Sequence, residues 1–294
     1  MIQSFKPITL VFAILLLLAF RTGYGYPELP AFNNPSKDQQ FQGKLIWMDL
    51  VTDDVEKATA FYSSLLGWES EVLTWQDKTY ALLKKDGVAI AGVHFRPSAE
   101  AAQNHGIWIP YISVADLDET KKLANEEGGQ LLLDGTLFNR GKQAIYRDDQ
   151  GTFIGFMESM TGDPDDDAAE LNEFNWLQLW TWDVDKALGF YQKVIGYESE
   201  ADDTQTKIYG YHLISEGNLR ASIMQLPESY KGGPSWLSFV SVENISTTVN
   251  KVKELGGDLL VEPQEELLGG RIAIIRDVMG AAIVVIEPKP KEEK

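Results

Sequence analysis

One stretch of the chain occurs twice, and this repetition limits the possible folds more than any other feature of the sequence. Residues 47–68 read WMDLVTDDVEKATAFYSSLLGW, and residues 176–197 read WLQLWTWDVDKALGFYQKVIGY. Matching residues, such as Tyr62 and Tyr191, are 129 positions apart in the two copies. A constant offset over this length indicates an internal duplication. We therefore expect the 294 residues to form two related domains rather than one large domain.

Each copy has the pattern of a strand followed by a helix. Residues 44–51 alternate between apolar and polar side chains, which predicts a strand. Asp53 or Asp54 is expected to cap the following helix, and Glu56, three residues after Asp53, resembles the second member of a capping box. One helical stripe is apolar: Val55, Ala58, Phe61, Tyr62 and Leu65. Three further strands are expected at residues 70–75, 79–84 and 88–95.

A second unit of the same kind follows in each half. Asp116 is expected to cap its helix in the first half, and Gly128 to end that helix. The strands of this unit are expected at residues 108–114, 130–133, 143–146 and 152–158. The predicted fold is therefore α+β, with four βαβββ units that form two curled mixed sheets, each around a cleft. Whether the units pair within a half or across the halves stays open.

The N-terminal residues have the layout of a secretory signal peptide. Lys6 precedes an apolar run at residues 8–20, and the small residues Gly23 and Gly25 follow it. The run is too short to cross a bilayer comfortably. We expect residues 1–25 to be a cleaved leader and the protein to be secreted or periplasmic, with no membrane contact after cleavage. The alternative is a membrane anchor formed by an uncleaved leader.

Composition divides the chain into segments and disfavours some functions. The predicted segments are a leader at 1–25, a tether at 26–42, a first domain at 43–160, an acidic linker at 161–171, a second domain at 172–289 and a tail at 290–294. The linker carries Gly, Pro and several aspartates, which is typical of a solvated run. There is no cysteine, so neither a lipid-modified cysteine nor a disulfide is possible. The net charge of −18 disfavours nucleic-acid binding, because phosphates attract a basic surface.

The repeated signature resembles that of a known family. A strand, an aspartate, a helix with Phe-Tyr and a Gly-aromatic turn, followed later by Gly-Gly and by Asp-x-x-Gly before a last strand, is similar to the vicinal oxygen chelate superfamily. That superfamily includes glyoxalase I, the bleomycin- and fosfomycin-resistance proteins and the extradiol dioxygenases. The resemblance covers about residues 43–160 and 172–289. It implies a tandem two-domain glyoxalase-like protein.

The resemblance also implies a divalent metal, which would be held by residues at fixed positions on the first and last strands of the units. Family members hold the metal with His or Gln on a first strand and Glu on a last strand, which allows Lewis-acid catalysis. The first-strand positions, seven residues before each capping residue, hold Trp47, Ile109, Trp176 and Leu237. The last-strand positions, four residues after the turn glycine, hold Gly155 and Val284. We therefore predict that no metal binds at the usual positions and that no cofactor is required.

The few other candidates for metal binding are scattered. The chain contains only His94, His105 and His212. His94 is expected in a strand beside the first cleft, His105 in a polar loop and His212 in an ordinary half-buried strand. Glu158 and Glu287 lie an odd number of residues from the metal positions, so they are expected on the opposite face of the sheet as surface acids.

Strand alternation predicts which side chains face the clefts. The candidate ligand-binding residues are Trp47, Asp49, Ile109 and Tyr111 in the first domain and Trp176, Gln178 and Phe239 in the second. Such aromatic walls with few polar groups suit a small, mostly apolar molecule. Asp49 could also meet a cation, with a cation–π contact from Trp47. The competing interpretation is that the tryptophans fill a collapsed core and that Arg140 or Lys142 neutralises Asp49.

Two functions remain open at this point. The first is an exported protein, similar to glyoxalases and bleomycin-resistance proteins, that binds a small apolar or cationic molecule without a metal. The second is a metal-dependent lyase, isomerase or dioxygenase whose non-standard ligands include Asp49 or His94; the catalytic residues are unknown. The expected partner is a small molecule, and the expected state is a monomer with pseudo-twofold tandem domains or a weak dimer. A scaffold that uses its surface is a third possibility.

Overall fold

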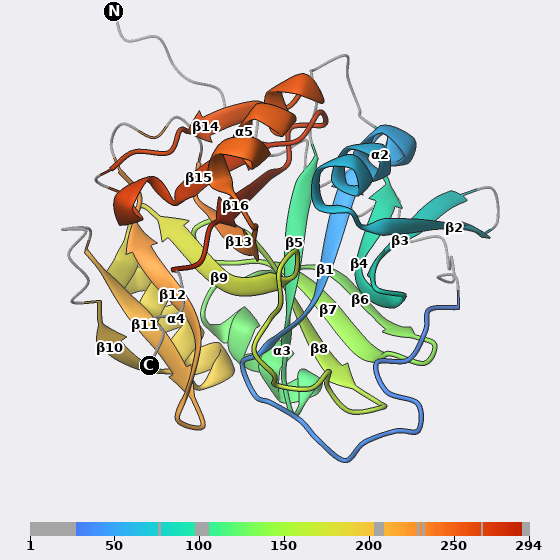
Figure 1. The fold of residues 1–294 in the computed structure, drawn as a ribbon. Helices are drawn as coiled ribbons and strands as arrows, with labels where there is room; N and C mark the ends of the chain where they lie inside the picture. Colours follow the sequence, from blue (N-terminus) through green and yellow to red (C-terminus); the bar gives the residue numbers. More distant parts are fainter. Residues whose placement is uncertain are drawn as a thin grey trace, which may run out of the picture.

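The computed structural model describes residues 28–75, 78–97, 106–202, 209–227, 230, 233–265 and 267–289. The predicted leader at 1–25 and tail at 290–294 lie outside this part of the chain, as does His105. Within it, the chain forms two eight-stranded mixed sheets, one in each half (Figure 1). This arrangement confirms the predicted α+β fold with tandem βαβββ units.

The first sheet contains both units of the first half. Its elements are β1 (Leu45–Thr52), α2 (Val55–Leu66), β2 (Glu69–Trp75), β3 (Lys78–Lys85), β4 (Val88–Phe95), β5 (Ile107–Ser113), α3 (Leu117–Glu126), β6 (Gln130–Leu137), β7 (Gly141–Arg147) and β8 (Phe153–Ser159). The strand order is β2-β3-β4-β1-β5-β8-β7-β6. The units join where β1 runs antiparallel to β5, with Trp47 opposite Tyr111. The units therefore pair within a half.

The second sheet repeats this order. Its elements are β9 (Phe174–Thr181), α4 (Val184–Ile195), β10 (Glu198–Ala201), β11 (Gly210–Ser215), β12 (Asn218–Gln225), β13 (Ser235–Ser241), α5 (Ile245–Glu254), β14 (Asp258–Val261), the short 3-10 helix η1 (Leu268–Gly270), β15 (Ile272–Arg276) and β16 (Ala282–Ile286). The strand order is β10-β11-β12-β9-β13-β16-β15-β14. In the centre, β9 pairs antiparallel with β13, and Trp176 lies opposite Phe239.

Helix caps come from the side chains that the sequence marks. Asp54 accepts a hydrogen bond from the backbone N–H of Lys57, so α2 is capped by Asp54 and the predicted capping box between Asp53 and Glu56 is wrong. Asp116 caps α3 through the N–H of Glu119, as predicted. Gly67 follows α2 in the left-handed region with φ 72°, a conformation that glycine adopts without a steric penalty.

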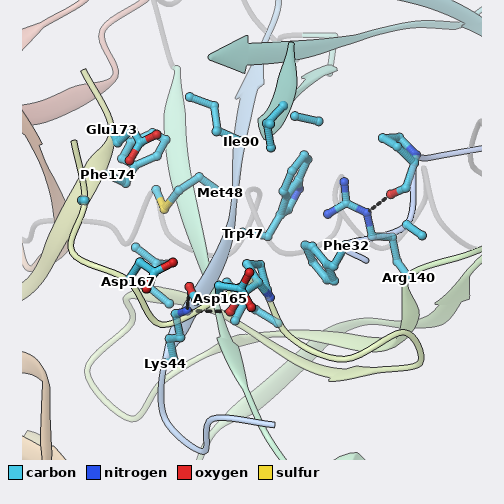
Figure 2. Close-up of a pocket in the computed structure, with 18 of the residues that line it drawn as sticks. Phe32, Lys44, Trp47, Met48, Ile90, Arg140, Asp165, Asp167, Glu173 and Phe174 are labelled. Atoms are coloured by element: carbon cyan, nitrogen blue, oxygen red, sulfur yellow. Dashed lines mark hydrogen bonds between the residues drawn. The ribbon is translucent and has the colours of Figure 1, made fainter. Parts of the chain in front are cut away.

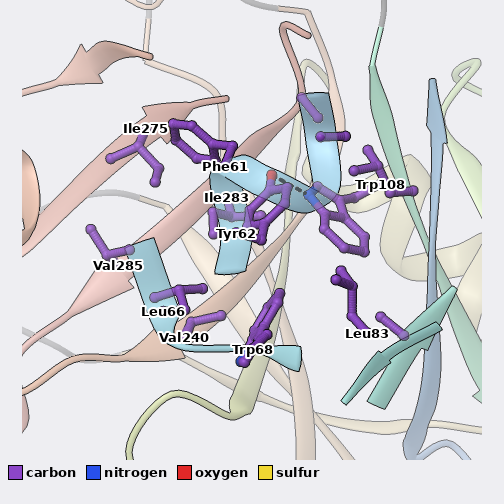
Figure 3. Close-up of a cluster of buried hydrophobic side chains, with 14 of the residues drawn as sticks. Phe61, Tyr62, Leu66, Trp68, Leu83, Trp108, Val240, Ile275, Ile283 and Val285 are labelled. Carbon is purple, nitrogen blue, oxygen red and sulfur yellow. Dashed lines mark hydrogen bonds between the residues drawn. The ribbon is translucent and has the colours of Figure 1, made fainter. Parts of the chain in front are cut away.

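Each helix packs on the sheet of its own half and also contacts a helix of the other half. One apolar cluster packs Phe61 and Leu66 of α2 against Ile275, Ile283 and Val285 of the second half (Figure 3). A second cluster packs α4 against α3 and against the helix-bearing face of the first sheet. Because each cluster takes residues from both sheets, neither half can bury its helix face without the other. The two domains therefore share one core.

The tyrosine of the repeated signature sits at the centre of each shared cluster. The indole N–H of Trp108 donates to the hydroxyl of Tyr62, 2.8 Å away (Figure 3). Trp236 makes the equivalent 2.8 Å bond to Tyr191 in the other cluster. The Tyr191 hydroxyl in turn donates to Asp148 of the first half, 2.8 Å away. The Phe-Tyr pair is therefore an element of the interface between the halves.

The predicted tether and linker pack together on the first domain. Asn33 donates its amide N–H groups to the backbone carbonyls of residues 161–163. Asp163 is fully buried and accepts from the N–H of Phe41 and the hydroxyl of Ser113. Burial raises the pKa of this carboxyl group. The prediction that the acidic run is solvated is therefore wrong at Asp163, whereas residues 165–170 are exposed.

The two glutamates at the strand ends face the helices. Glu158 accepts a hydrogen bond from the N–H of Leu117 at the start of α3. Glu287 accepts from the N–H of Ile245 at the start of α5. Both therefore lie on the face opposite the predicted clefts. None of the helices in the described part of the chain is both long enough and apolar enough to span a membrane.

Candidate functional site

The face of each sheet that carries no helix is here called the open face. The structure places the predicted residues of the first domain, Trp47, Asp49, Ile109 and Tyr111, on the open face of the first sheet, where all four are buried. It places Trp176, Gln178 and Phe239 on the open face of the second sheet. Trp176 and Gln178 are half-buried, and Phe239 is buried. Their placement agrees with strand alternation, and ligand binding by them stays a prediction.

Asp49 is the polar centre of the first open face. The indole N–H of Trp47 donates to Asp49 Oδ1, 2.8 Å away, and His94 Nε2 lies 3.2 Å from Asp49 Oδ2. Burial alone would raise the pKa of Asp49, but the interaction with His94 and hydrogen bonds from His94, Tyr111 and Trp47 outweigh it. The pKa of this carboxyl group is therefore below its usual value. Asp49 is an internal anion with its acceptor positions in use.

Arg140 occupies the position where a cationic ligand was expected. Its guanidinium lies 3.9 Å from the ring centre of Trp47 and 4.0 Å from that of Phe32 (Figure 2). Its charge also interacts with Asp49. The cation–π contact predicted for an external cation is therefore made by the protein itself. Lys142, the other proposed partner, instead pairs with Glu158 and Asp118 near the surface.

Residues 28–32, near the start of the predicted tether, cover this part of the open face. Leu29 is 2% exposed and packs in the same apolar cluster as Trp47. The carbonyl of Pro30 accepts a 2.5 Å hydrogen bond from Arg140 Nε, and Phe32 meets Trp47 edge-on at 6.2 Å. The segment therefore holds the Arg140 guanidinium against the Trp47 indole.

A pocket of about 430 Å³ opens beside Trp47. Its apolar wall comes from the starts of β1 and β4, and its other side comes from the segment at 30–32 and the linker (Figure 2). On its inner side the pocket is lined by Phe32, Trp47, Met48, Ile90 and Arg140. Toward the linker it is lined by Lys44, Asp165, Asp167 and Glu173. A volume in this range is typical of small-molecule sites. The pocket therefore combines an aromatic wall, one buried cation and an acidic rim.

The open face of the second domain has a neutral polar centre. Gln178 and Trp176 both donate to the hydroxyl of Ser222, at 3.0 and 3.1 Å. The indole N–H of Trp180 donates to Gln178 Oε1, 2.7 Å away, and Trp180 meets Tyr230 edge-on at 5.0 Å. His212 lies near Trp176 and Asp202, half-buried as predicted. This face offers amide and hydroxyl groups where the first domain has Asp49 and Arg140.

The family's metal positions do not fit a metal here. Trp47 and Tyr111 lie opposite each other on β1 and β5, and Tyr111 pairs with Gly155 on β8. A Cβ at Gly155 would stand 2.5 Å from the Tyr111 ring, so this position has no room for a carboxylate side chain. The equivalent row of the second domain is Trp176, Phe239 and Val284. Among the described residues, no group of three or more His, Asp or Glu side chains is placed to hold a metal ion.

Several residues of the first open face and of its pocket were missed in the sequence. Phe32 and Leu29 are apolar residues in a polar, proline-containing stretch, which was the available signal that this stretch packs on something. Tyr80 meets His94 edge-on at 4.5 Å, and Met48 and Ile90 line the pocket. No local pattern marks these last residues, because strands and a linker far apart in the chain bring them together.

Comparison with known proteins decides the family. The model of the Glyoxalase/Bleomycin resistance protein/Dioxygenase superfamily matches residues 44–156 and 173–285. The chain belongs to this superfamily. The predicted resemblance is thereby confirmed, in both repeats.

Relatives of known name share about a quarter of their residues with this chain. CFP32 of Mycobacterium bovis, a proposed glyoxylase, is 25% identical over 261 residues, which cover 88% of this chain and all of that protein. The anthracycline biosynthesis protein DauV of Streptomyces is 27% identical over 265 residues, which cover 83% of this chain and 93% of that protein.

Solved structures of the superfamily share the fold. The Mn(II)-bound glyoxalase of Novosphingobium aromaticivorans has a TM-score of 0.56 at 12% identity and covers 84% of this chain and 83% of its own. The 2,2′,3-trihydroxybiphenyl 1,2-dioxygenase of Sphingomonas wittichii has a TM-score of 0.55 at 14% identity and covers 84% and 91%. At these identities the likeness shows the fold alone.

Proposed function

We propose that this member of the superfamily binds a small molecule with an apolar body in the pocket beside Trp47, and that it does so without a metal. The observation that carries the proposal is that an indole stands at the family's first metal position and lines a pocket of about 430 Å³. An indole cannot coordinate a divalent cation as imidazole does, but it offers a large flat surface to an apolar ligand.

The charges around the pocket favour a ligand that is neutral or cationic at its outer end. Asp167 and Glu173 line the side formed by the linker, and Asp167 is exposed. Lys44, the cation on that side, is taken by Asp166 and by the carbonyls of Pro164 and Asp165. The rim therefore has an excess of negative charge, which attracts a positive substituent.

The relatives are compatible with binding of a polycyclic molecule. DauV is named for anthracycline biosynthesis, and its similarity covers both halves of this chain. The apolar side chains that line the pocket, among them Trp47, Met48 and Ile90, suit an aromatic ring system. Aromatic probes therefore test the proposal.

Fluorescence titration with the neutral probe N-phenyl-1-naphthylamine tests the proposal. We expect saturable binding in the presence of EDTA, with quenching of tryptophan emission. Ile90→Glu places a charge in the apolar wall and should weaken binding at least about 10-fold, because the charge must be desolvated. Trp47→Ala should abolish most of the quenching. Val72→Glu is the matched control, since Val72 is a strand residue of the same domain that is 59% exposed and lies outside the pocket.

A metal-dependent enzyme is the second candidate, and one contact favours it. His94 Nε2 and Asp49 Oδ2 are 3.2 Å apart, so two potential ligands already lie together. Elemental analysis of the purified chain separates the two functions. One divalent ion per chain, lost in His94→Ala or Asp49→Ala, together with EDTA-sensitive probe binding, would replace our proposal with this one.

Export is part of the proposal, and it rests on residues 1–25 alone. An apolar run of this length behind Lys6 is the pattern of a signal peptide. The mass of the protein recovered outside the cytoplasm should lack the leader. Recovery of the full-length chain in the cytoplasm would contradict export without touching the pocket.

A further inference from the structure

Arg140 is a buried cation whose hydrogen-bonding capacity is only partly used. Its side chain is 1% exposed, and no carboxylate lies within 4.0 Å of it in the described part of the chain. Nε donates to the carbonyl of Pro30, whereas Nη1 is buried without a hydrogen-bond partner among the described residues. Leaving a charged donor buried and unsatisfied is costly, so such a group calls for an explanation, and a bound ligand is one.

Asp49 does not fill this role. Its two oxygens are engaged by Trp47 and His94. It therefore balances the charge of Arg140 from a distance without accepting its protons. Burial lowers the pKa of Arg140 to about 10, so the guanidinium still carries its proton at neutral pH.

The guanidinium is also fixed in orientation. Phe32 and Trp47 pack against the guanidinium from two adjacent sides, and Pro30 holds Nε (Figure 2). A planar, fixed guanidinium presents its remaining N–H groups in one plane, which is the geometry that carboxylates bind most strongly. Arg140 lines the pocket together with Trp47, so a ligand in the pocket lies beside the guanidinium.

The second domain has no guanidinium at the position that matches Arg140. By the 129-residue offset of the repeat, this position is Gly269. Arg271 matches Lys142: Lys142 lies opposite Glu158 in the pair of β7 and β8, and the Arg271 carbonyl accepts the N–H of Glu287. The Arg271 side chain donates from Nη1 to the carbonyl of Glu287 at 2.9 Å. The buried Arg140 guanidinium is therefore a feature of the first domain.

We propose that Arg140 binds an anionic oxygen of the ligand, a carboxylate or an ionised phenol, while the ligand's aromatic body lies against Trp47. This rests on the proposed function and names the ligand class. The ligand is then an aromatic acid with its acidic group toward Arg140 and its neutral or cationic end toward Asp167 and Glu173.

Three probes with one ring system test this assignment by calorimetry: 2-naphthoate, 2-naphthol and 2-naphthylmethylammonium. We expect 2-naphthoate to bind about 10- to 100-fold more tightly than 2-naphthol at pH 7.5, the effect of one charged hydrogen bond. Arg140→Met should remove this preference and leave 2-naphthol binding within about 3-fold. Arg271→Met is the control, because Arg271 is an arginine of the second domain that does not line the pocket, and it should leave the binding of all three probes unchanged.

The outcomes separate the two proposals. If 2-naphthol and 2-naphthoate bind equally and Arg140→Met changes neither, the assignment of Arg140 is wrong and the pocket still binds apolar molecules. If none of the three binds to the full chain, both proposals are wrong. Should Arg140→Met lose its circular-dichroism signal at 25 °C, Arg140→Lys replaces it. Arg140→Lys keeps the positive charge but lacks the paired N–H donors of a guanidinium. If this variant still prefers 2-naphthoate over 2-naphthol to the same degree, the carboxylate is not bound by two N–H groups of Arg140.

Discussion

At the scale of single residues, the polar centre of the first domain depends on the absence of a side chain. A Cβ at Gly92 of β4 would stand 2.5 Å from Asp49 Oδ1 and would also contact the ring of Tyr80. Because all these groups are buried, they cannot move aside freely. We expect Gly92→Ala to lower the free energy of unfolding by about 1–3 kcal/mol in urea titrations.

Gly135→Ala is the matched control for this change. Gly135 lies in strand β6 with nothing within 4 Å of its missing Cβ. Its substitution should leave stability unchanged or raise it by a few tenths of a kcal/mol, because alanine restricts the unfolded chain. Equal effects at the two glycines would show that backbone propensity, and not the Asp49 cluster, sets the cost.

The residue scale also shows where sequence reasoning ends. Alternation along β1 and β5 was enough to place Trp47, Asp49 and Tyr111 on one face, since the period of a strand is two. It was not enough to find Phe32 stacked on Arg140, because this contact joins the tether to the start of β7. Local patterns report which face a residue occupies, and tertiary packing decides which neighbour it meets.

At the scale of elements, glutamates at the ends of strands cap the starts of helices. Glu287 follows β16, and its carboxylate accepts the N–H of Ile245 in the first turn of α5, 2.8 Å away. A negative charge at a helix N-terminus also interacts favourably with the helix dipole. We expect Glu287→Ala to reduce stability by about 1 kcal/mol in urea unfolding.

Glu243→Ala is the control at this scale, because Glu243 is an exposed acid just before the same helix. Its effect should stay within about 0.5 kcal/mol. If both variants lose the same stability, the effect comes from general charge near α5 and not from the cap. The sequence marked Asp116 as the start of α3, but nothing in it indicated that a strand-end glutamate would reach the same helix.

At the scale of the whole molecule, the duplication produces one core. Each helix of a half packs with the other half, with α2 beside α5 and α3 beside α4 (Figure 1). The sequence predicted four units and left their pairing open. The reason is physical: the apolar stripe of Phe61 and Leu66 looks the same whichever sheet it covers. The open faces are the surfaces that these shared clusters leave free. The pocket lies where the open face of the first sheet meets one of the clusters, with Trp47 from the open face and Met48 from the cluster.

The interface between the halves carries a titratable group, Asp277. Burial raises the pKa of the Asp277 carboxyl group to about 6. The neighbouring Tyr62 hydroxyl has a pKa well above its usual value, because it is buried and because the charge of Asp277 lies close to it. The unfolded carboxyl titrates near about 3.9. Between these pH values the folded protein holds a proton that the unfolded chain has lost. Rising pH therefore favours unfolding across this window, and the loss is complete above about pH 6.

Asp277→Asn should remove this contribution. The amide oxygen of the introduced asparagine can still accept the backbone N–H groups of Met279 and Ala281 that Asp277 Oδ1 now accepts. We expect the variant to gain stability relative to the natural chain as pH rises from about 4 to about 6, by up to about 3 kcal/mol, and to keep that gain at higher pH. Urea unfolding of both chains at a series of pH values measures the difference between their free energies of unfolding. The contributions of the other carboxylates are the same in both chains and cancel in this difference. Parallel stability curves would mean that Asp277 keeps an ordinary pKa, and that the contact between the halves is insensitive to pH.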